Sequence, residues 1–423
     1  MTLNGATILI GLSLVYVLRL LVLSRRRDSL QIGAPSSVYF VFLVPCLNEE
    51  RVIGACLDRL ADLTNDNFSV LVIDDGSDDH TATIVQGSTF ERVQLMQRTA
   101  PNARKGKGEA LNAAYRYLLH APMLEGRNPQ DVIVAVVDAD GRLASNALYE
   151  VAPYFRDPRV GGVQIGVRMY NASESLLARM QDVEFVTFTE IFQRARQHLG
   201  SAGLGGNGQF TRLSALQSLG DAPWTDRLTE DLDLGIQLLL AGWTTRFCPT
   251  SDVSQQAVVQ VRRLVRQRVR WFQGHLQCWA RIPDLVRSDL PPLTVIDLSF
   301  HLLAASLVLL LTIPSALFFA TLIVMLIAAP SATSHLFLAH DGFLLVLAYL
   351  LSFAMAPIYG VVYWLRDGRV SLFKALLLSH AFAVYSYIWV PAGWRALGRT
   401  IKRRRDWAKT ARSIDKPTER LAV

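Results

Sequence analysis

Two aspartates separated by one residue form the first group in this sequence that could do chemistry. Asp138 and Asp140 follow the apolar run 132–137, which has the composition of a buried strand. In an extended chain residues two apart face the same side. Such a pair could hold Mg²⁺ or Mn²⁺, which in turn would bind a diphosphate. A solvated turn is the alternative, but a second acidic strand end, Asp74-Asp75, favours the metal site.

A glycine- and lysine-rich loop offers a second candidate, for phosphate binding. Lys107 lies between Gly106 and Gly108, just before the helical pattern 109–119. Backbone N–H groups at a helix start together with a lysine suit a phosphate. The spacing is not that of a P-loop, and lysines exposed in a loop would look the same.

Two adjacent acids open a later helix. Thr229, Glu230 and Asp231 precede the apolar pattern 232–242. A threonine N-cap followed by acids is what a helix start prefers for structural reasons alone. The functional interpretation makes Asp231 a general base that takes a proton from a hydroxyl nucleophile.

Residues 258–276 have the period of an amphipathic helix. One stripe is apolar, and the opposite face carries polar residues around a tryptophan. The apolar stripe consists of Val261, Val265, Val269, Phe272 and Leu276, and the opposite face of Gln267, Arg270, Trp271 and Gly274. We interpret this as a helix along the membrane interface that presents its second face to a catalytic pocket. The alternative is a basic surface helix with an interfacial tryptophan anchor.

These groups sit in a pattern of alternating strands and helices. Strands are expected at 38–46, 69–75, 93–98 and 131–138, with helical spacing between them. The pattern predicts an α/β fold with a largely parallel sheet, in which ligands bind beyond the carboxyl ends of the strands. The acidic clusters lie at those ends.

Composition places this body beside a membrane. The 423 residues are 51% apolar and only 19% charged, a composition that argues against a wholly soluble chain. Residues 3–23 are long enough to span a bilayer. Because Arg25, Arg26 and Arg27 follow them directly, the N-terminus is expected outside and the body in the cytoplasm.

The C-terminal part contains three apolar runs, 293–329, 342–365 and 371–391. If all three crossed, the basic tail 395–412 would lie outside, against the positive-inside rule. We favour a run 371–391 that lies in or re-enters the membrane. The alternative is a hairpin of two short helices broken at Pro314. Either way residues 28–290 and the tail are cytoplasmic.

The net charge of +7 comes from two basic patches, residues 258–290 and 395–412. Beside apolar runs, such patches favour an anionic membrane surface over nucleic acid as the partner. The sequence thus divides into an N-terminal membrane helix 1–27, a catalytic domain 28–257, interfacial helices 258–292, a membrane region 293–394 and a basic tail 395–423.

The order of the motifs resembles the membrane-embedded family-2 glycosyltransferases, the group of cellulose, chitin, hyaluronan and poly-N-acetylglucosamine synthases. The resemblance covers about residues 38–280. It rests on P-C-L-N-E-E (45–50), D-D-G-S (74–77), G-K (106–107), D-A-D (138–140), T-E-D (229–231) and Q-R-V-R-W (267–271). It implies a GT-A-type fold and inverting transfer of a sugar from a nucleoside diphosphate, usually UDP.

The resemblance also implies roles for single residues. Asp231 would be the base, with Glu230 beside it, and Asp138 and Asp140 would hold the metal, Mg²⁺ or Mn²⁺. The donor UDP-sugar would be bound by Pro45, Asn48, Glu50, Asp74, Asp75, Lys107, Asp138, Gln267, Arg270 and Trp271. Asp74 would contact the uracil, and Gln267, Arg270 and Trp271 would close over the diphosphate.

The acceptor stays open at this point. A processive synthase in the bacterial cell membrane, extending a β-linked polysaccharide from UDP-glucose or UDP-N-acetylglucosamine, is the leading hypothesis. A lipid glycosyltransferase similar to ceramide glucosyltransferase is the second. The loop 203–210 (GLGGNGQF) identifies no subfamily, and the intact acids at 138, 140 and 231 argue against an inactive membrane scaffold.

Overall fold

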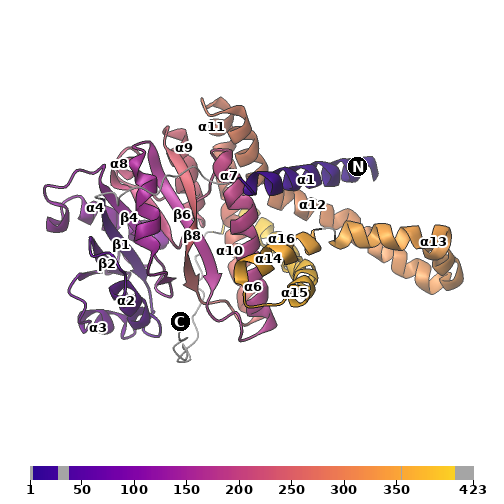
Figure 1. Ribbon diagram of the computed structural model, residues 1–423, viewed down its shortest axis with the longest axis horizontal. Helices are drawn as coiled ribbons and strands as arrows, with labels where there is room; N and C mark the ends of the chain where they lie inside the picture. The colour runs from indigo at the N-terminus through magenta and orange to yellow at the C-terminus, as the bar shows by residue number, and fades with distance from the viewer. Residues whose placement is uncertain (1–2, 27–37, 354, 405–423) are drawn as a thin grey trace.

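An eight-stranded sheet forms the centre of the chain. The computed structural model describes residues 3–26, 38–353 and 355–404, and Figure 1 shows their arrangement. The strands are β1 (Tyr39–Cys46), β2 (Phe68–Asp74), β3 (Val93–Gln97), β4 (Val132–Val136), β5 (Arg142–Leu143), β6 (Val160–Met169), β7 (Gln209–Arg212) and β8 (Thr244–Gln255). Their order is β3-β2-β1-β4-β7-β6-β8-β5. Strands β1 to β4 are parallel to one another, and β7 runs antiparallel to both β4 and β6. The predicted α/β fold with a largely parallel sheet is confirmed.

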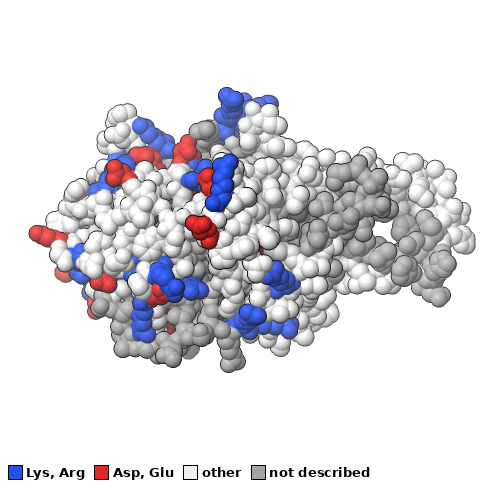
Figure 2. Space-filling model, turned by 90° about the horizontal axis from the view of Figure 1, so that it is seen from above, with Lys and Arg blue, Asp and Glu red and all other residues white. Residues whose placement is uncertain are grey.

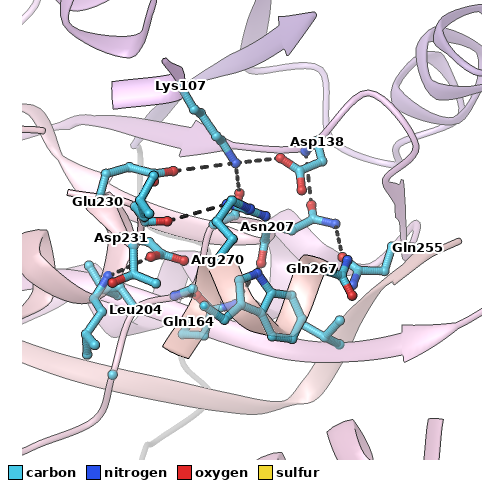
Figure 3. A pocket seen from close by; sticks show the side chains of 18 of the residues that line it. Lys107, Asp138, Gln164, Leu204, Asn207, Glu230, Asp231, Gln255, Gln267 and Arg270 are labelled. Atoms are coloured by element: carbon cyan, nitrogen blue, oxygen red, sulfur yellow. Dashed lines mark hydrogen bonds and ion pairs between the residues drawn. The ribbon is translucent and has the colours of Figure 1, made fainter. Parts of the chain in front are cut away.

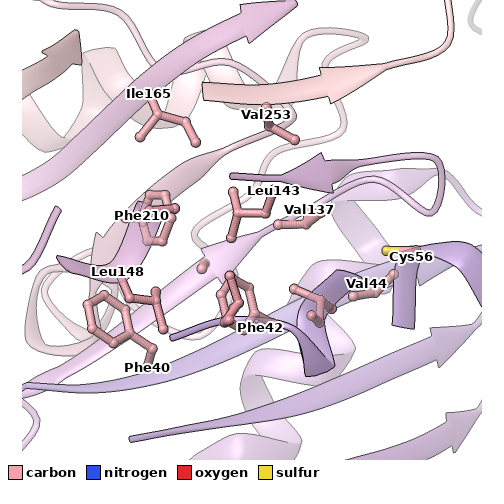
Figure 4. Close-up of a cluster of buried hydrophobic side chains, with 14 of the residues drawn as sticks. Phe40, Phe42, Val44, Cys56, Val137, Leu143, Leu148, Ile165, Phe210 and Val253 are labelled. Atoms are coloured by element: carbon pink, nitrogen blue, oxygen red, sulfur yellow. The ribbon is translucent and has the colours of Figure 1, made fainter. Parts of the chain in front are cut away.

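Both faces of the sheet are buried, which explains why its strands read as uninterrupted apolar runs. Along β1, Phe40 and Phe42 belong to the core on one face, and Val41 and Leu43 to the core on the other. Figure 4 shows the first of these cores, where the Phe42 and Phe68 rings pack edge to face at 5.4 Å between centroids. Strand register is fixed by this alternation, because a shift of one residue would exchange the two faces.

Helices of the body cover the sheet. They are α2 (Ile53–Ala61), α3 (Thr81–Gln86), α4 (Lys107–Leu118), α5 (Ala147–Val151), α8 (Leu213–Gln217) and α9 (Glu230–Leu240), with short 3₁₀ turns η1 (Pro122–Leu124) and η2 (Ala152–Arg156). Of these, α2, α3, α4 and α9 lie where the sequence predicts helices, whereas α5 and α8 were not predicted. In α2 the apolar positions Ile53, Cys56, Leu57 and Leu60 are all buried, as their spacing predicts. A further helical stretch, α6 (Leu176–Thr187), the π-helix η3 (Phe188–Gln193) and α7 (Arg194–His198), lies between the sheet and the apolar helices.

One strand ends earlier than expected. The sequence predicts a strand that continues to Asp138, but β4 ends at Val136 and Asp138 to Asp140 lie at a turn. The reason is local, since the N–H of Gly141 donates to the carbonyl of Asp138 at 2.7 Å and closes the turn. The same-side relation of the two carboxylates, which assumed an extended chain, therefore does not apply.

The helix predicted at 258–276 is α10 (Val261–Cys278), but its apolar stripe has a different partner. Val265, Val269 and Phe272 are buried against Leu309 of α12 and Ala396 of α16. For these three residues the interpretation of α10 as a helix lying on the membrane interface is therefore wrong, because protein covers them, whereas Val261 at the start of the stripe is exposed. Short helical segments η4 (Trp279–Arg281) and α11 (Ile282–Arg287) follow.

The apolar helices lie on one side of the body. They are α1 (Leu3–Ser24), α12 (Pro292–Ala328), α13 (Pro330–Phe353), α14 (Ala356–Asp367), α15 (Leu372–Tyr385), η5 (Ser386–Ile388) and α16 (Trp389–Ile401). In the described part of the chain, Pro292–Ala328 and Leu372–Ile401 are long and apolar enough to cross a membrane. Figure 1 shows α12 and α13 projecting beyond the body, and in Figure 2 the coloured charged side chains lie over the body rather than over that projection.

The boundaries of the apolar helices differ from those expected. The run 342–365 is split between α13 and α14, and Pro357 stands in the first turn of α14, where proline is tolerated. The run 371–391 does not end at Pro391, because that residue stands in the first turn of α16. The alternative hairpin at Pro314 is wrong, since α12 is continuous through that position. The cytoplasmic side of the body stays a prediction, and most of the tail 395–423 lies outside the described residues.

A glycine sets the distance between α10 and the start of α9. A Cβ at Gly274 would lie 2.5 Å from side-chain atoms of Thr229 and 2.7 Å from its backbone nitrogen. Gly274→Ala should therefore overpack this contact and lower the free energy of unfolding by about 1–3 kcal/mol. The effect is measured as a lower apparent Tm of the detergent-solubilised protein. The control is Gly398→Ala in α16, where the new methyl group meets open space and should stabilise the helix by up to about 1 kcal/mol. Equal Tm values for both variants would contradict this account.

Candidate active site

One cavity of about 470 Å³ collects most of the predicted site residues. It is lined from one side by the ends of β1, β2 and β4, and from the other by α6, η3, α10, α12 and α16. Of the predicted residues, those that line it are Pro45, Asp75, Lys107, Asp138, Glu230, Asp231, Gln267, Arg270 and Trp271. The structure therefore brings together groups that the sequence spreads over more than 200 positions.

Lys107 is the positive centre of the strand-end side. It stands at the start of α4, and its Nζ donates to Asp138 Oδ1 at 2.5 Å and to the Gly206 carbonyl at 2.6 Å. Glu230 Oε1 lies 4.0 Å away (Figure 3). Burial alone would lower the pKa of Lys107, but the charges of Asp138 and Glu230 outweigh it and the pKa is raised. The ammonium group is therefore charged at neutral pH.

The two acids of the T-E-D motif differ in their surroundings. Glu230 is buried, and burial together with the charge of Asp231 raises the pKa of Glu230 to about 7. Asp231 faces the cavity beside Gly206, where a Cβ would meet both Asp231 Oδ2 and Lys107 Nζ at 3.1 Å. Thr229 holds the N-cap position of α9, but its side chain makes no capping hydrogen bond. The interpretation of T-E-D as a helix cap alone thus loses the threonine hydrogen bond on which it mainly depended.

The two aspartates of the D-A-D motif are separated by the turn after β4. Asp138 lines the cavity, whereas Asp140 is 3% exposed and accepts a hydrogen bond from the backbone N–H of Gln256 at 3.0 Å. Among the described residues no group of three or more His, Cys, Asp or Glu side chains is arranged to hold a metal. What fits is a cation held by one carboxylate and completed by phosphate oxygens, the usual arrangement for Mg²⁺.

The first two motifs give two lining acids, Glu49 and Asp75, and several supporting groups. Asp75 lines the cavity and is held by Arg98, whose Nη1 lies 2.5 Å from Asp75 Oδ1. Burial raises the pKa of Asp75, and Arg98 opposes the shift. Asp74 is buried and accepts from the backbone of Ser77.

Two residues of P-C-L-N-E-E also hydrogen-bond to the loop that follows β2 and do not form the cavity wall. Asn48 Nδ2 donates to Asp78 Oδ1 at 2.5 Å, and Glu50 accepts from the N–H of His80. Neither is among the residues that line the cavity, although Glu49 between them is.

The Q-R-V-R-W face of α10 does reach the cavity. Gln267, Arg270 and Trp271 all line it. The Trp271 ring is fixed by Phe185, edge to face at 6.0 Å, and by the guanidinium of Arg268, 4.1 Å from its centroid. Arg268 thus holds the tryptophan in place and does not itself line the cavity.

Several lining residues were missed by the motif analysis. Gln164, Asn207 and Gln255 form a chain of amides, with Gln164 Nε2 donating to the Asn207 carbonyl at 2.9 Å and Asn207 Nδ2 to Gln255 Oε1 at 2.9 Å (Figure 3). Arg196, His275, His301 and Trp389 line the opposite side. His275 could have been found, since it follows Trp271 by one helical turn, but the others carry no local signal.

Comparison with solved structures identifies the fold. A mannosyltransferase from Pyrobaculum calidifontis, solved with GDP-Man and Mn²⁺, superposes with a TM-score of 0.56 at 22% identity, covering 86% of this chain and 99% of that one. The GT-A-like fold expected from the motifs is therefore confirmed.

Sequence relatives include enzymes with different acceptors. A beta-monoglucosyldiacylglycerol synthase of Trichormus variabilis is 33% identical over 290 residues, 67% of this chain and 59% of its own length. A poly-beta-1,6-N-acetyl-D-glucosamine synthase of Staphylococcus aureus is 28% identical over 244 residues, 55% of this chain and 53% of that protein. The chain therefore spans between half and three fifths of these relatives.

The family assignment rests on the domain that builds the cavity. The model of the family described as "Glycosyltransferase like family 2" matches residues 35–274. This range contains all eight strands of the sheet, both acids of T-E-D, and Gln267, Arg270 and Trp271 of α10. The chain belongs to glycosyltransferase family 2.

Proposed function

We propose that this protein transfers a hexose, with inversion, from a UDP-sugar to the hydroxyl group of a membrane lipid. One observation carries the proposal: a single cavity joins the strand-end acids and Lys107 to His301, which stands in the long apolar helix α12. A donor can enter from the body, and an acceptor can enter from the side of the apolar helices. The named activity of the diacylglycerol relative supports a lipid acceptor.

The donor would lie on the strand-end side. Its nucleotide would lie near Pro45 and Asp75, and its diphosphate between Lys107 and Arg270. Two cations in a water-poor cavity stabilise the charge that develops on the leaving diphosphate. Glu230 adds little repulsion there, because a pKa of about 7 leaves a large share of it uncharged at neutral pH.

Asp231 would act from the acceptor side. Its carboxylate takes the proton of the acceptor hydroxyl while that oxygen forms a bond to the anomeric carbon and the bond from this carbon to the diphosphate breaks. One carboxylate is enough for this single displacement, which inverts the anomeric centre. Trp271 would support the acceptor and Gln267 the donor, both from α10.

A divalent cation, Mg²⁺ or Mn²⁺, would be held by Asp138 together with donor phosphate oxygens and would supply positive charge to the leaving group. Asp140 would support the turn that carries Asp138. The Mn²⁺ bound by the mannosyltransferase of similar fold agrees with this cofactor.

The protein is proposed to be integral to a bacterial cell membrane, with its catalytic domain in the cytoplasm. The apolar helices Pro292–Ala328 and Leu372–Ile401 support the membrane association. The hairpin of α12 and α13 would cross and return, and α14 to α16, which lie near the body in Figure 1, would stay at the interface.

A processive polysaccharide synthase is the second candidate. The poly-N-acetylglucosamine synthase of Staphylococcus aureus supports it, since the match covers the same domain. In that case the side of the cavity near α12 would receive a growing chain rather than a lipid headgroup.

Product analysis tests the proposed function. Purified protein in vesicles that contain diacylglycerol is incubated with radiolabelled UDP-glucose, UDP-galactose or UDP-N-acetylglucosamine. We expect label in the lipid extract as a single glycolipid, and none with the Asp231→Asn control. Label only in a polymer that stays at the origin of a gel would contradict the lipid proposal and support the synthase.

The role of Asp231 is tested by a substitution of equal size. Asp231→Asn keeps the shape and most of the favourable helix-start interaction, but it removes the proton acceptor. Transfer should fall by roughly 10²-fold or more, while UDP-sugar affinity and Tm stay close to those of the unmodified protein. Normal transfer would return Asp231 to a structural role worth about 1 kcal/mol.

Two arginines of α10 give a matched test of the lining face. Arg270 lines the cavity, whereas Arg266 is exposed on the same helix. Arg270→Ala should lose roughly 3 kcal/mol of transition-state stabilisation, more than 100-fold in rate. Arg266→Ala should lose at most the surface attraction of one charge, about 1 kcal/mol. Equal and mild defects in a side-by-side transfer assay would remove Arg270 from the mechanism.

A further inference from the structure

The side of the cavity away from the strand ends contains an arginine with unused hydrogen-bond donors. Arg196 stands in α7 and lines the cavity, yet its side chain is only 1% exposed. Its Nε donates to Asp297 Oδ2 at 2.9 Å. Among the described residues its two terminal nitrogens, Nη1 and Nη2, find no hydrogen-bond partner. A buried donor left unpaired in this way costs free energy, so the arrangement indicates a ligand.

The charge balance around Arg196 indicates what kind of ligand fits. Asp297 is 2% exposed and offsets the guanidinium charge, and it also accepts from the hydroxyls of Tyr16 at 2.7 Å and Ser201 at 2.6 Å. The ion pair of Arg196 and Asp297 carries no net charge. Burial also lowers the pKa of His275, which lines the same cavity, so this imidazole is neutral at neutral pH. An anionic group here would place a second, uncompensated negative charge in a dry site, which is costly. A neutral oxygen acceptor avoids that cost.

Arg196 lines the same cavity as Asp231, the proposed base. His275 also lines this cavity, and its ring is 5.5 Å from that of His301 in α12. A small acceptor could thus have its hydroxyl at Asp231 and its next polar group at Arg196. Phe185 and Phe188, which line the same cavity, offer apolar surface beside that group.

Resting on the proposed function, we propose that Arg196 selects the acceptor by binding an ester carbonyl oxygen of a neutral glycerolipid. Arginine only donates hydrogen bonds, and a carbonyl oxygen only accepts them, so its two lone pairs match Nη1 and Nη2. The glycerol backbone places ester carbonyls a few atoms from the free hydroxyl. Gly203 lines the cavity beside this guanidinium group, because a Cβ there would lie 3.4 Å from Nη1.

The test compares two acceptors that differ only in those carbonyl groups. Dioleoylglycerol carries esters, and its diether analogue keeps the hydroxyl and the chains. For the unmodified protein the acceptor KM should be about 10- to 100-fold lower for the diester, the effect of a hydrogen bond to a charged group. Arg196→Lys keeps the charge beside Asp297 but loses the planar fork, and should bring this preference close to unity with the KM for UDP-sugar unchanged.

Two further variants separate recognition from folding. Gly203→Ala leaves the buried charges in place and should narrow the same preference, so it carries the test if Arg196→Lys does not fold. Arg212→Lys is the control: Arg212 is equally buried, donates to the carbonyls of Phe155 and Val160 and does not line the cavity. It should lower Tm and leave the ester preference intact.

Each outcome decides the matter. An unmodified protein that uses diester and diether equally, or an ester preference that survives both Arg196→Lys and Gly203→Ala, would overturn the role of Arg196 while leaving lipid transfer in place. Loss of the preference in Arg212→Lys would also overturn it. Failure of the unmodified protein to glycosylate either lipid would instead overturn the proposed function, and this assignment with it.

Discussion

The buried guanidinium group of Arg268 joins the catalytic body to the apolar helices. It is fully buried, donates to Glu184 of α6 at 2.5 Å and to the hydroxyl of Tyr385 at 3.2 Å, and stacks between the rings of Trp271 and Trp389. Glu184 also accepts from Tyr385 and Trp389. Removing one partner of such a buried pair costs about 3–5 kcal/mol. Four helices from distant parts of the chain therefore depend on one charge.

Around this charge, α10 is held between two close contacts made possible by glycine. On one side Gly274 lets it approach Thr229, and on the other Gly393 of α16 leaves room for the ring of Phe272, where a Cβ would lie 2.9 Å away. Small shifts of the apolar helices must therefore be transmitted to the start of α9 and to the lining face of α10, because close-packed contacts have little room to absorb them. The position of Trp271 in the cavity is thus set by packing against α16 as much as by the catalytic domain.

The sequence predicted the strands of the parallel sheet and the helices between them well, because both patterns are encoded locally. The strand β1, with alternate residues buried on two faces, and the helix α2, with its buried spacing, follow from period alone. The turn after Val136 was only the alternative interpretation of the sequence, because the backbone hydrogen bond that closes it, from Gly141 to Asp138, leaves no periodic pattern there. The lipid-facing interpretation of Val265 failed for a different reason, since periodicity shows that a face is buried but not what buries it. Arg196 has no local signal at all, as its meaning depends on Asp297, which is 101 residues away.

The T-E-D motif shows how neighbouring acids can acquire different properties from their surroundings. Glu230 is buried beside Asp231, and its pKa of about 7 means that it gains its charge only near neutral pH. Lys107 and Arg270 oppose this shift without cancelling it. Below that pH Glu230 is protonated and no longer competes for Lys107 and Arg270, so both cations can attract the proposed donor diphosphate. Two acids of nearly the same chemistry thus suit separate tasks, because both line the cavity but Glu230 is buried whereas Asp231 is half-buried beside a glycine.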